Sequence, residues 1–103
     1  MHSKTFLPLM PDEAAALLAS RLKAERLRLG WKQGTLARRS GVSVPTIRRY
    51  EIGGQTTVMN LLKICHALGR LDEVTDLFQP PVASSIEELE QASGKPKRKR
   101  GTR

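Results

Sequence analysis

The chain has 103 residues, one cysteine, one Trp, one Tyr, two Phe and a net charge of +8. This length predicts one domain with a small aliphatic core, and no set of catalytic side chains is recognisable, so we expect neither an enzyme nor a cofactor. The lone Cys65 excludes a disulfide framework and a cysteine-based metal site. No apolar run approaches the roughly 18 residues of a membrane span, so a cytoplasmic protein is expected.

The charge is unevenly distributed along the chain. Residues 21–49 contain nine basic groups against Glu25 alone, and residues 94–103 contain six basic groups and no acid. Residues 70–90 contain six acidic groups against Arg70 alone. This division predicts a polyanion as the partner of the basic half and something else at the acidic half. The other interpretation is that both runs are simply solvated surface.

The first predicted helix covers residues 11–29. Pro11 suits a first helical turn, and Asp12 and Glu13 are favourable at the positive end of the helix dipole. Apolar spacing gives this helix one buried face, expected to consist of Ala15, Leu18, Ala19, Leu22 and Leu29. Gly30 ends the helix.

Four further helices are expected over residues 33–40, 44–52, 57–68 and 71–78. Glycines or prolines follow each of them. The expected buried residues of the 57–68 helix are Val58, Leu61, Leu62, Cys65 and Leu68. The 71–78 helix presents Leu71, Val74, Leu77 and Phe78 on one side, which is expected to form a seam between two copies; the alternative is that these residues complete the core of one copy. Ser85-Ile86-Glu87-Glu88 is a capping box that predicts one more short helix.

No segment alternates like a strand, so the fold is predicted to be all-α. We expect an N-terminal arm over residues 1–10 and a compact five-helix domain over 11–79. Residues 80–103 are expected to form an acidic short helix and a disordered basic tail. DNA contact, a nuclear signal and a solubility function are the alternatives for the tail.

Residues 33–52 have the pattern of a helix-turn-helix, in which two short helices are joined by a glycine-containing turn. Ala37 is small where the two helices would cross, and Gly41 is placed where the turn requires a positive φ. The residues expected to hold the helices together are Leu36, Val42, Ile47 and Tyr50.

The second helix of this pair contains a proline, which its position explains. If Ser43 is the N-cap, Pro45 is the second helical residue, where a missing N–H removes no helical bond. The outward residues are then Val44, Pro45, Thr46, Arg48 and Arg49. Such residues enter the major groove, where arginine can bond guanine and apolar groups can touch a thymine methyl. Arg49 is the first candidate for a base contact and Arg48 can equally bind a phosphate, whereas two merely solvated arginines are the alternative.

The string RLKAERLRLGWKQGTLARRSGVSVPTIRRYEIG…LLKICHALG, from Arg21 to Gly69, resembles the Cro/repressor (XRE) class of five-helix DNA-binding domains. The resemblance implies that Gln33 contacts DNA and that Arg26 and Glu51 form a structural pair. Lys32 replaces the usual Thr or Ser cap, where it could contact a phosphate, and Gly34 replaces a better helix former. The predicted DNA-binding set is Gln33, Val44, Pro45, Thr46, Arg48, Arg49, Lys32 and Arg38.

The string ALGRLDEVTDLFQPP…SIEELE…GKPKRKR is similar to the tails of HipB-type antitoxins, the autorepressor partners of HipA-type kinase toxins. This similarity implies a homodimer on a palindromic double-stranded operator, associated with the bacterial nucleoid. It also implies a complex with a HipA-type kinase, with or without a third small component. Two alternatives share the same helix-turn-helix: a protein-interaction module that mainly binds the kinase, and a phage-type repressor without a toxin.

Overall fold

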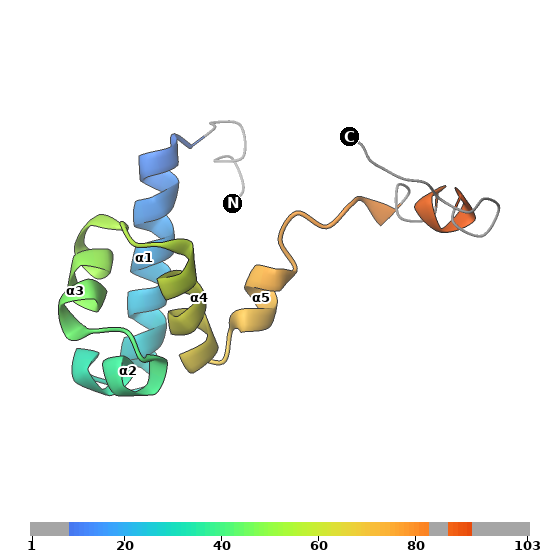
Figure 1. Cartoon of the computed structure of the whole chain (residues 1–103). Helices are drawn as coiled ribbons and strands as arrows, with labels where there is room; N and C mark the ends of the chain where they lie inside the picture. Colours follow the sequence, from blue (N-terminus) through green and yellow to red (C-terminus); the bar gives the residue numbers. More distant parts are fainter. Residues whose placement is uncertain (1–8, 83–86, 92–103) are drawn as a thin grey trace.

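The computed structural model describes residues 9–82 and 87–91. Its labelled helices are α1 (Pro11–Arg28), α2 (Gln33–Ser40), α3 (Val44–Gly53), α4 (Val58–Ala67) and α5 (Leu71–Thr75) (Figure 1). Residues 87–91 are also helical. Neither described range contains a strand, and the predicted all-α fold is confirmed.

The long helix α1 starts and stops for local reasons. Pro11 occupies its first turn, and the Glu13 carboxylate accepts a hydrogen bond from the Met10 backbone N–H at 2.9 Å. Arg26 and Arg28 lie in the last turn, where positive charge suits the helix dipole. Gly30 then turns the chain with φ +76°. The start and end of α1 therefore follow from rules that act within one turn.

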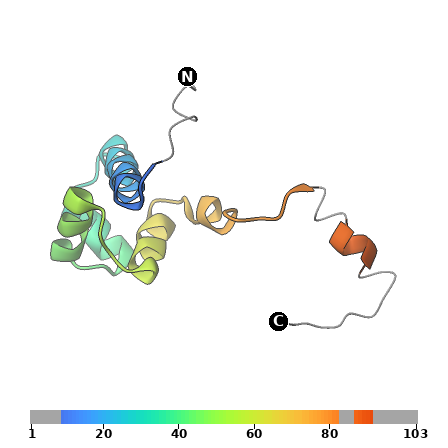
Figure 2. The same ribbon diagram turned by 90° about the horizontal axis from the view of Figure 1, so that it is seen from above.

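The core lies where α1 meets α3 and where α2 meets both α3 and α4. Figures 1 and 2 show α5 on the side of α4 that is remote from α3. The buried core residues are Ala19, Leu36, Val42, Ile47, Tyr50, Ile64 and Leu68. Leu22, Leu29, Trp31, Ala37, Leu61 and Ala67 pack around them. These contacts fix α3 against the rest of the domain.

Two residues predicted to be buried are exposed. Leu18 is 48% exposed because the buried face of α1 is centred on Ala19 and Arg26, one position further round the helix. Val58 is 71% exposed because it begins the first turn of α4, beyond the Thr57 cap. Ile64 of α4, which was not predicted to be buried, is buried. Ala19, Cys65 and Leu68 are buried as predicted, so only part of each of these two apolar faces differs from what spacing indicates.

The last labelled helix is shorter than predicted. It ends at Thr75, and the Leu77 N–H bonds the Val74 carbonyl in a tight turn. The prolines at 80 and 81 disfavour helical backbone in the residues before them. Phe78 has φ +64° and is 98% exposed, and Leu77 is also exposed, so neither residue completes the core of a single copy.

Several predicted features lie outside the described residues. These are most of the N-terminal arm, Ser85 and Ile86 of the capping box, and the basic tail. Among the described helices, none has the length and hydropathy that a membrane crossing requires.

Candidate nucleic-acid interface

The turn between α2 and α3 depends on one glycine. Gly41 has φ +77°, and its N–H donates to the Ala37 carbonyl at 2.9 Å to close α2. The Val42 N–H donates to the Ser40 hydroxyl at 3.1 Å, and the Val42 side chain is buried. The positive φ predicted for Gly41 is confirmed. This turn makes α3 cross α2 and leaves Pro45, in the first turn of α3, exposed.

Ser43 caps α3. Its hydroxyl oxygen accepts from the Thr46 N–H at 3.3 Å and donates to the Thr46 hydroxyl at 2.8 Å. Pro45 lies in the first turn, where no intrahelical bond is lost. The cap predicted from the sequence is confirmed. The Thr46 hydroxyl is thereby fixed, and its own proton can still be donated outward.

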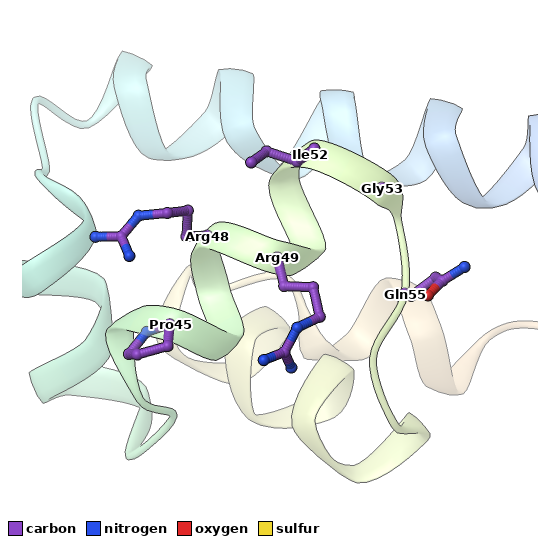
Figure 3. A pocket seen from close by; sticks show the side chains of 6 residues that line it. All are labelled: Pro45, Arg48, Arg49, Ile52, Gly53 and Gln55. Carbon is purple, nitrogen blue, oxygen red and sulfur yellow. The ribbon is translucent and has the colours of Figure 1, made fainter.

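The residues of α3 differ in burial according to the side of the helix on which they lie. Ile47 and Tyr50 are buried, and Val44 and Thr46 are half-buried. Pro45, Arg48, Arg49 and Ile52 are exposed. Figure 3 shows the guanidinium groups of Arg48 and Arg49 pointing away from one another. Five of the predicted DNA-binding residues therefore lie on or beside one outward surface of this helix.

A buried ion pair ties α1 to the end of α3. The Arg26 Nε donates to Glu51 Oε2 at 2.7 Å and a second guanidinium nitrogen donates to Oε1 at 2.9 Å. The two side chains are only 7% and 5% exposed. Arg26 also donates to the Trp31 carbonyl at 2.8 Å, so the same group orders the connection to α2. A two-pronged bond of this kind fixes orientation as well as distance.

The amide of Gln33 belongs to the same cluster. Its Nε2 donates to Glu51 Oε1 at 2.9 Å. The second N–H of that amide is left for another acceptor, such as a phosphate. Burial opposes ionisation of Glu51 most strongly, but the bonds from Arg26 and Gln33 together outweigh it and lower the pKa of Glu51. Glu51 is therefore a charged carboxylate, and in this form it accepts the hydrogen bonds that link α1 and α2 to α3.

Comparison with known families bears on this arrangement directly. A family model described as Helix-turn-helix matches residues 22–74, more than half of the chain. The chain belongs to the helix-turn-helix family. Its resemblance to the Cro/repressor type is supported by the same match, and the protein is a DNA-binding transcription regulator. The searches of curated proteins and of solved structures found no match.

Within this helix-turn-helix protein, ion pairs occupy three arginines that are not in the predicted DNA-binding set. Arg26 is paired with Glu51, and Arg28 bonds Glu25 at 2.7 Å. Arg70 bonds Glu25 at 3.2 Å and also Glu73. In contrast, four predicted DNA-binding residues are exposed, and their side chains have no hydrogen bond or ion pair within residues 9–82 and 87–91: Lys32, Arg38, Arg48 and Arg49. Unpaired basic groups on α2 and α3 are available to phosphates.

Two contacts in this region were not predicted. The Arg39 guanidinium lies 4.6 Å from the centre of the Trp31 ring, a cation–π contact that fixes the outer side of α2. The bond from Gln33 to Glu51 was not expected either. Lys32 caps α2 with no side-chain hydrogen bond, so the missing Ser or Thr cap is not replaced there. Arg39 follows Trp31 by eight positions, with the start of α2 between them, and this spacing gives no signal for their contact.

Proposed function

We propose that this DNA-binding regulator is a repressor that reads sequence with the outward surface of α3. The observation that carries the proposal is the pair of unpartnered, exposed arginines, Arg48 and Arg49, on a helix whose end is fixed by buried Glu51. Phosphate contacts supply affinity and contacts to base edges supply specificity. A bound protein would act by covering promoter elements.

The proposed DNA-binding residues are assigned to different parts of the DNA, either bases or phosphates. Arg49 lies one turn from Thr46, and we assign it to a guanine, whose O6 and N7 one guanidinium can bond together. Val44 and Thr46 are suited to a thymine methyl. Phosphates are assigned to Gln33, Lys32 and Arg38, which lie on or next to α2, and to the exposed Arg48 of α3.

We also propose that the protein acts as a homodimer on a palindromic operator. One helix-turn-helix reads only a half-site, and two copies one helical turn apart read the whole. Leu71 and Val74 are half-buried on α5, whereas the adjacent Leu77 and Phe78 are exposed. Within the described residues, nothing covers these large apolar side chains next to α5. Their exposure supports an interface between two copies at this end of the domain.

The first test is Arg49→Ala on two duplexes: the DNA upstream of the protein's own gene and a scrambled duplex of equal length. The unaltered protein is expected to prefer the upstream DNA by about 10³ or more, and the variant to lose roughly 10- to 100-fold of that preference. Affinities are measured by titration at two salt concentrations.

Arg38→Ala is the matched control, since it removes an exposed arginine of α2. It is expected to weaken binding to both duplexes equally and to lower the salt dependence by about one phosphate contact. Equal, steeply salt-dependent binding of the unaltered protein to both duplexes would contradict a specific repressor.

The finer proposal is an antitoxin that autoregulates a HipA-type toxin–antitoxin operon. Its support is the resemblance of the C-terminal third and the acidic surface that the structure leaves exposed there, at Asp72, Glu73, Asp76, Glu87 and Glu88. A variant of this proposal has kinase binding as the main activity, with DNA binding secondary. A phage-type repressor without a toxin is the third possibility, because it would share all of α2 and α3.

Reversing the charge of Glu87, Glu88 and Glu90 separates these possibilities. Because the three side chains are exposed and distant in sequence from α3, operator binding is expected to be unchanged. Pull-down of a co-expressed HipA-type kinase is expected to be lost if this acidic segment is the docking site. Retained kinase binding would place the docking site elsewhere, and no binding by the unaltered protein would favour the phage-type repressor.

A further inference from the structure

An exposed isoleucine lies on the surface of α3 that faces outward. Ile52 is 81% exposed, which is unusual for a large aliphatic side chain at the end of a well-packed helix. It follows Pro45 and Arg49 at helical spacing, so all three belong to the same face. None of the DNA contacts assigned above uses this residue.

Ile52 is one wall of a shallow hollow. The hollow has a volume of about 430 Å³ and is lined by Pro45, Arg48, Arg49, Ile52, Gly53 and Gln55 (Figure 3). Much of this lining is aliphatic, because it is formed by the proline ring, the isoleucine side chain and the methylene groups of the two arginines. The charged ends of the two arginines extend from its rim, so the hollow combines an apolar floor with cationic edges.

The backbone next to Ile52 leaves room for a ligand. Gly53 has open space where a Cβ atom would stand. Gly54 turns the chain away at once, with φ +76°. A sugar-phosphate strand or a base edge can therefore approach the backbone of Gly53 closely, beside Ile52.

The length of α3 allows Ile52 to reach DNA together with the first residues of the helix. Ile52 lies eight residues after Val44, about 12 Å along a helix axis. The major groove is about 12 Å wide. Because a helix is itself about 10–12 Å across, it fills the width of the groove and lies lengthwise in it, so Ile52, on the same face as Arg49, meets the bases further along the same groove.

We propose that Ile52 is a specificity residue, which contacts the C5-methyl group of a thymine at the edge of each half-site. The inference rests on the proposed sequence-specific binding and adds a reader at the C-terminal end of α3. Thymine is the only base that presents a methyl group in the major groove. An aliphatic side chain with no polar atoms can distinguish it only by that group, and Pro45 and the arginine stems complete an apolar seat for it.

The test replaces thymine by deoxyuridine, which removes the methyl group and keeps every hydrogen bond of the base pair. Duplexes are first selected from a random pool with the unaltered protein. Each thymine of the enriched site is then replaced in turn. At one thymine of each half-site the unaltered protein is expected to bind about four-fold more weakly, the ratio that corresponds to burial of one methyl group. In Ile52→Ala that difference should fall to none, while the differences at other thymines remain.

Leu27→Ala is the matched control, because it truncates another exposed aliphatic residue, on α1. This variant should retain the full four-fold difference. A deoxyuridine effect that is the same in Ile52→Ala and the unaltered protein at every thymine overturns the assignment, and so does an enriched site whose thymines show no such effect. In both cases the enriched site itself upholds sequence-specific binding. Selection that enriches no sequence overturns the proposed function, and the inference with it.

Discussion

Replacing Glu51 by alanine is expected to lower the free energy of unfolding by roughly 3–5 kcal/mol. The substitution leaves the Arg26 guanidinium buried without its acid, and it also removes the acceptor of Gln33. Buried donors without partners lose their hydration and gain nothing in return. Urea unfolding followed by circular dichroism measures the change, and Arg26→Ala is expected to fall in the same range.

A double substitution tests whether the pair is a source of stability or of orientation. Arg26→Met with Glu51→Leu removes both charges together, so its unfolding free energy is expected to lie much closer to that of the unaltered protein than either single variant does. Glu73→Ala, at an exposed ion pair with Arg70, is the control and should have far less effect than Glu51→Ala. A Glu51→Ala variant that unfolds at the original urea midpoint would contradict the role of this pair.

The same variants connect stability to DNA binding. Glu51 follows Tyr50 near the end of α3, and its partner is on α1, so the pair sets the angle at which α3 leaves the domain. The double variant keeps the fold but replaces directional bonds by apolar contacts that tolerate sliding. We therefore expect it to lose operator preference while it remains folded.

The parts of this fold that depend on local rules could be predicted from the sequence. Ser43 as a cap, Pro45 in the first turn and Gly41 at a positive φ each follow from geometry within four residues. The bounds of α2 were predicted for the same reason, since Gly41 must end it.

The parts that depend on how helices cross could not be predicted. The Trp31 contact with Arg39 and the bond from Gln33 to Glu51 join side chains whose meeting depends on the angle between elements. Leu18 was misassigned because spacing defines an apolar stripe without fixing which edge of it meets the core. The pair of Arg26 and Glu51 was expected only from family resemblance, since 25 residues separate its members.

A glycine at the end of α3 gives the second large expected effect. Gly54→Ala should lower the free energy of unfolding by roughly 2–5 kcal/mol, because two penalties add. The residue has φ +76°, and an added Cβ would lie 2.7 Å from the carbonyl carbon and oxygen of Ala15. These are backbone atoms of α1, which cannot move aside as a flexible side chain can.

Two other glycines, one at each end of α3, separate the two penalties. Gly41→Ala meets the same unfavourable φ but no atom within 4 Å, so it should cost only about 1–2 kcal/mol. Gly53→Ala meets open space at a helical φ, and it should be neutral or stabilising by up to about 1 kcal/mol through helix propensity. The expected order of stability is thus Gly53→Ala, then Gly41→Ala, then Gly54→Ala, measured by urea unfolding.

A Gly54→Ala variant no less stable than Gly41→Ala would mean that α1 does not approach the end of α3 as closely as described.

If the expected order of stability is found, the contact between Gly54 and α1 has a functional consequence. Gly54 and the pair of Arg26 and Glu51 fix the same end of α3 to α1, one by close backbone packing and the other by directed bonds. The outward surface of α3 is then presented to DNA from a helix that is anchored at its far end, which is the condition for side chains such as Arg49 to discriminate between bases.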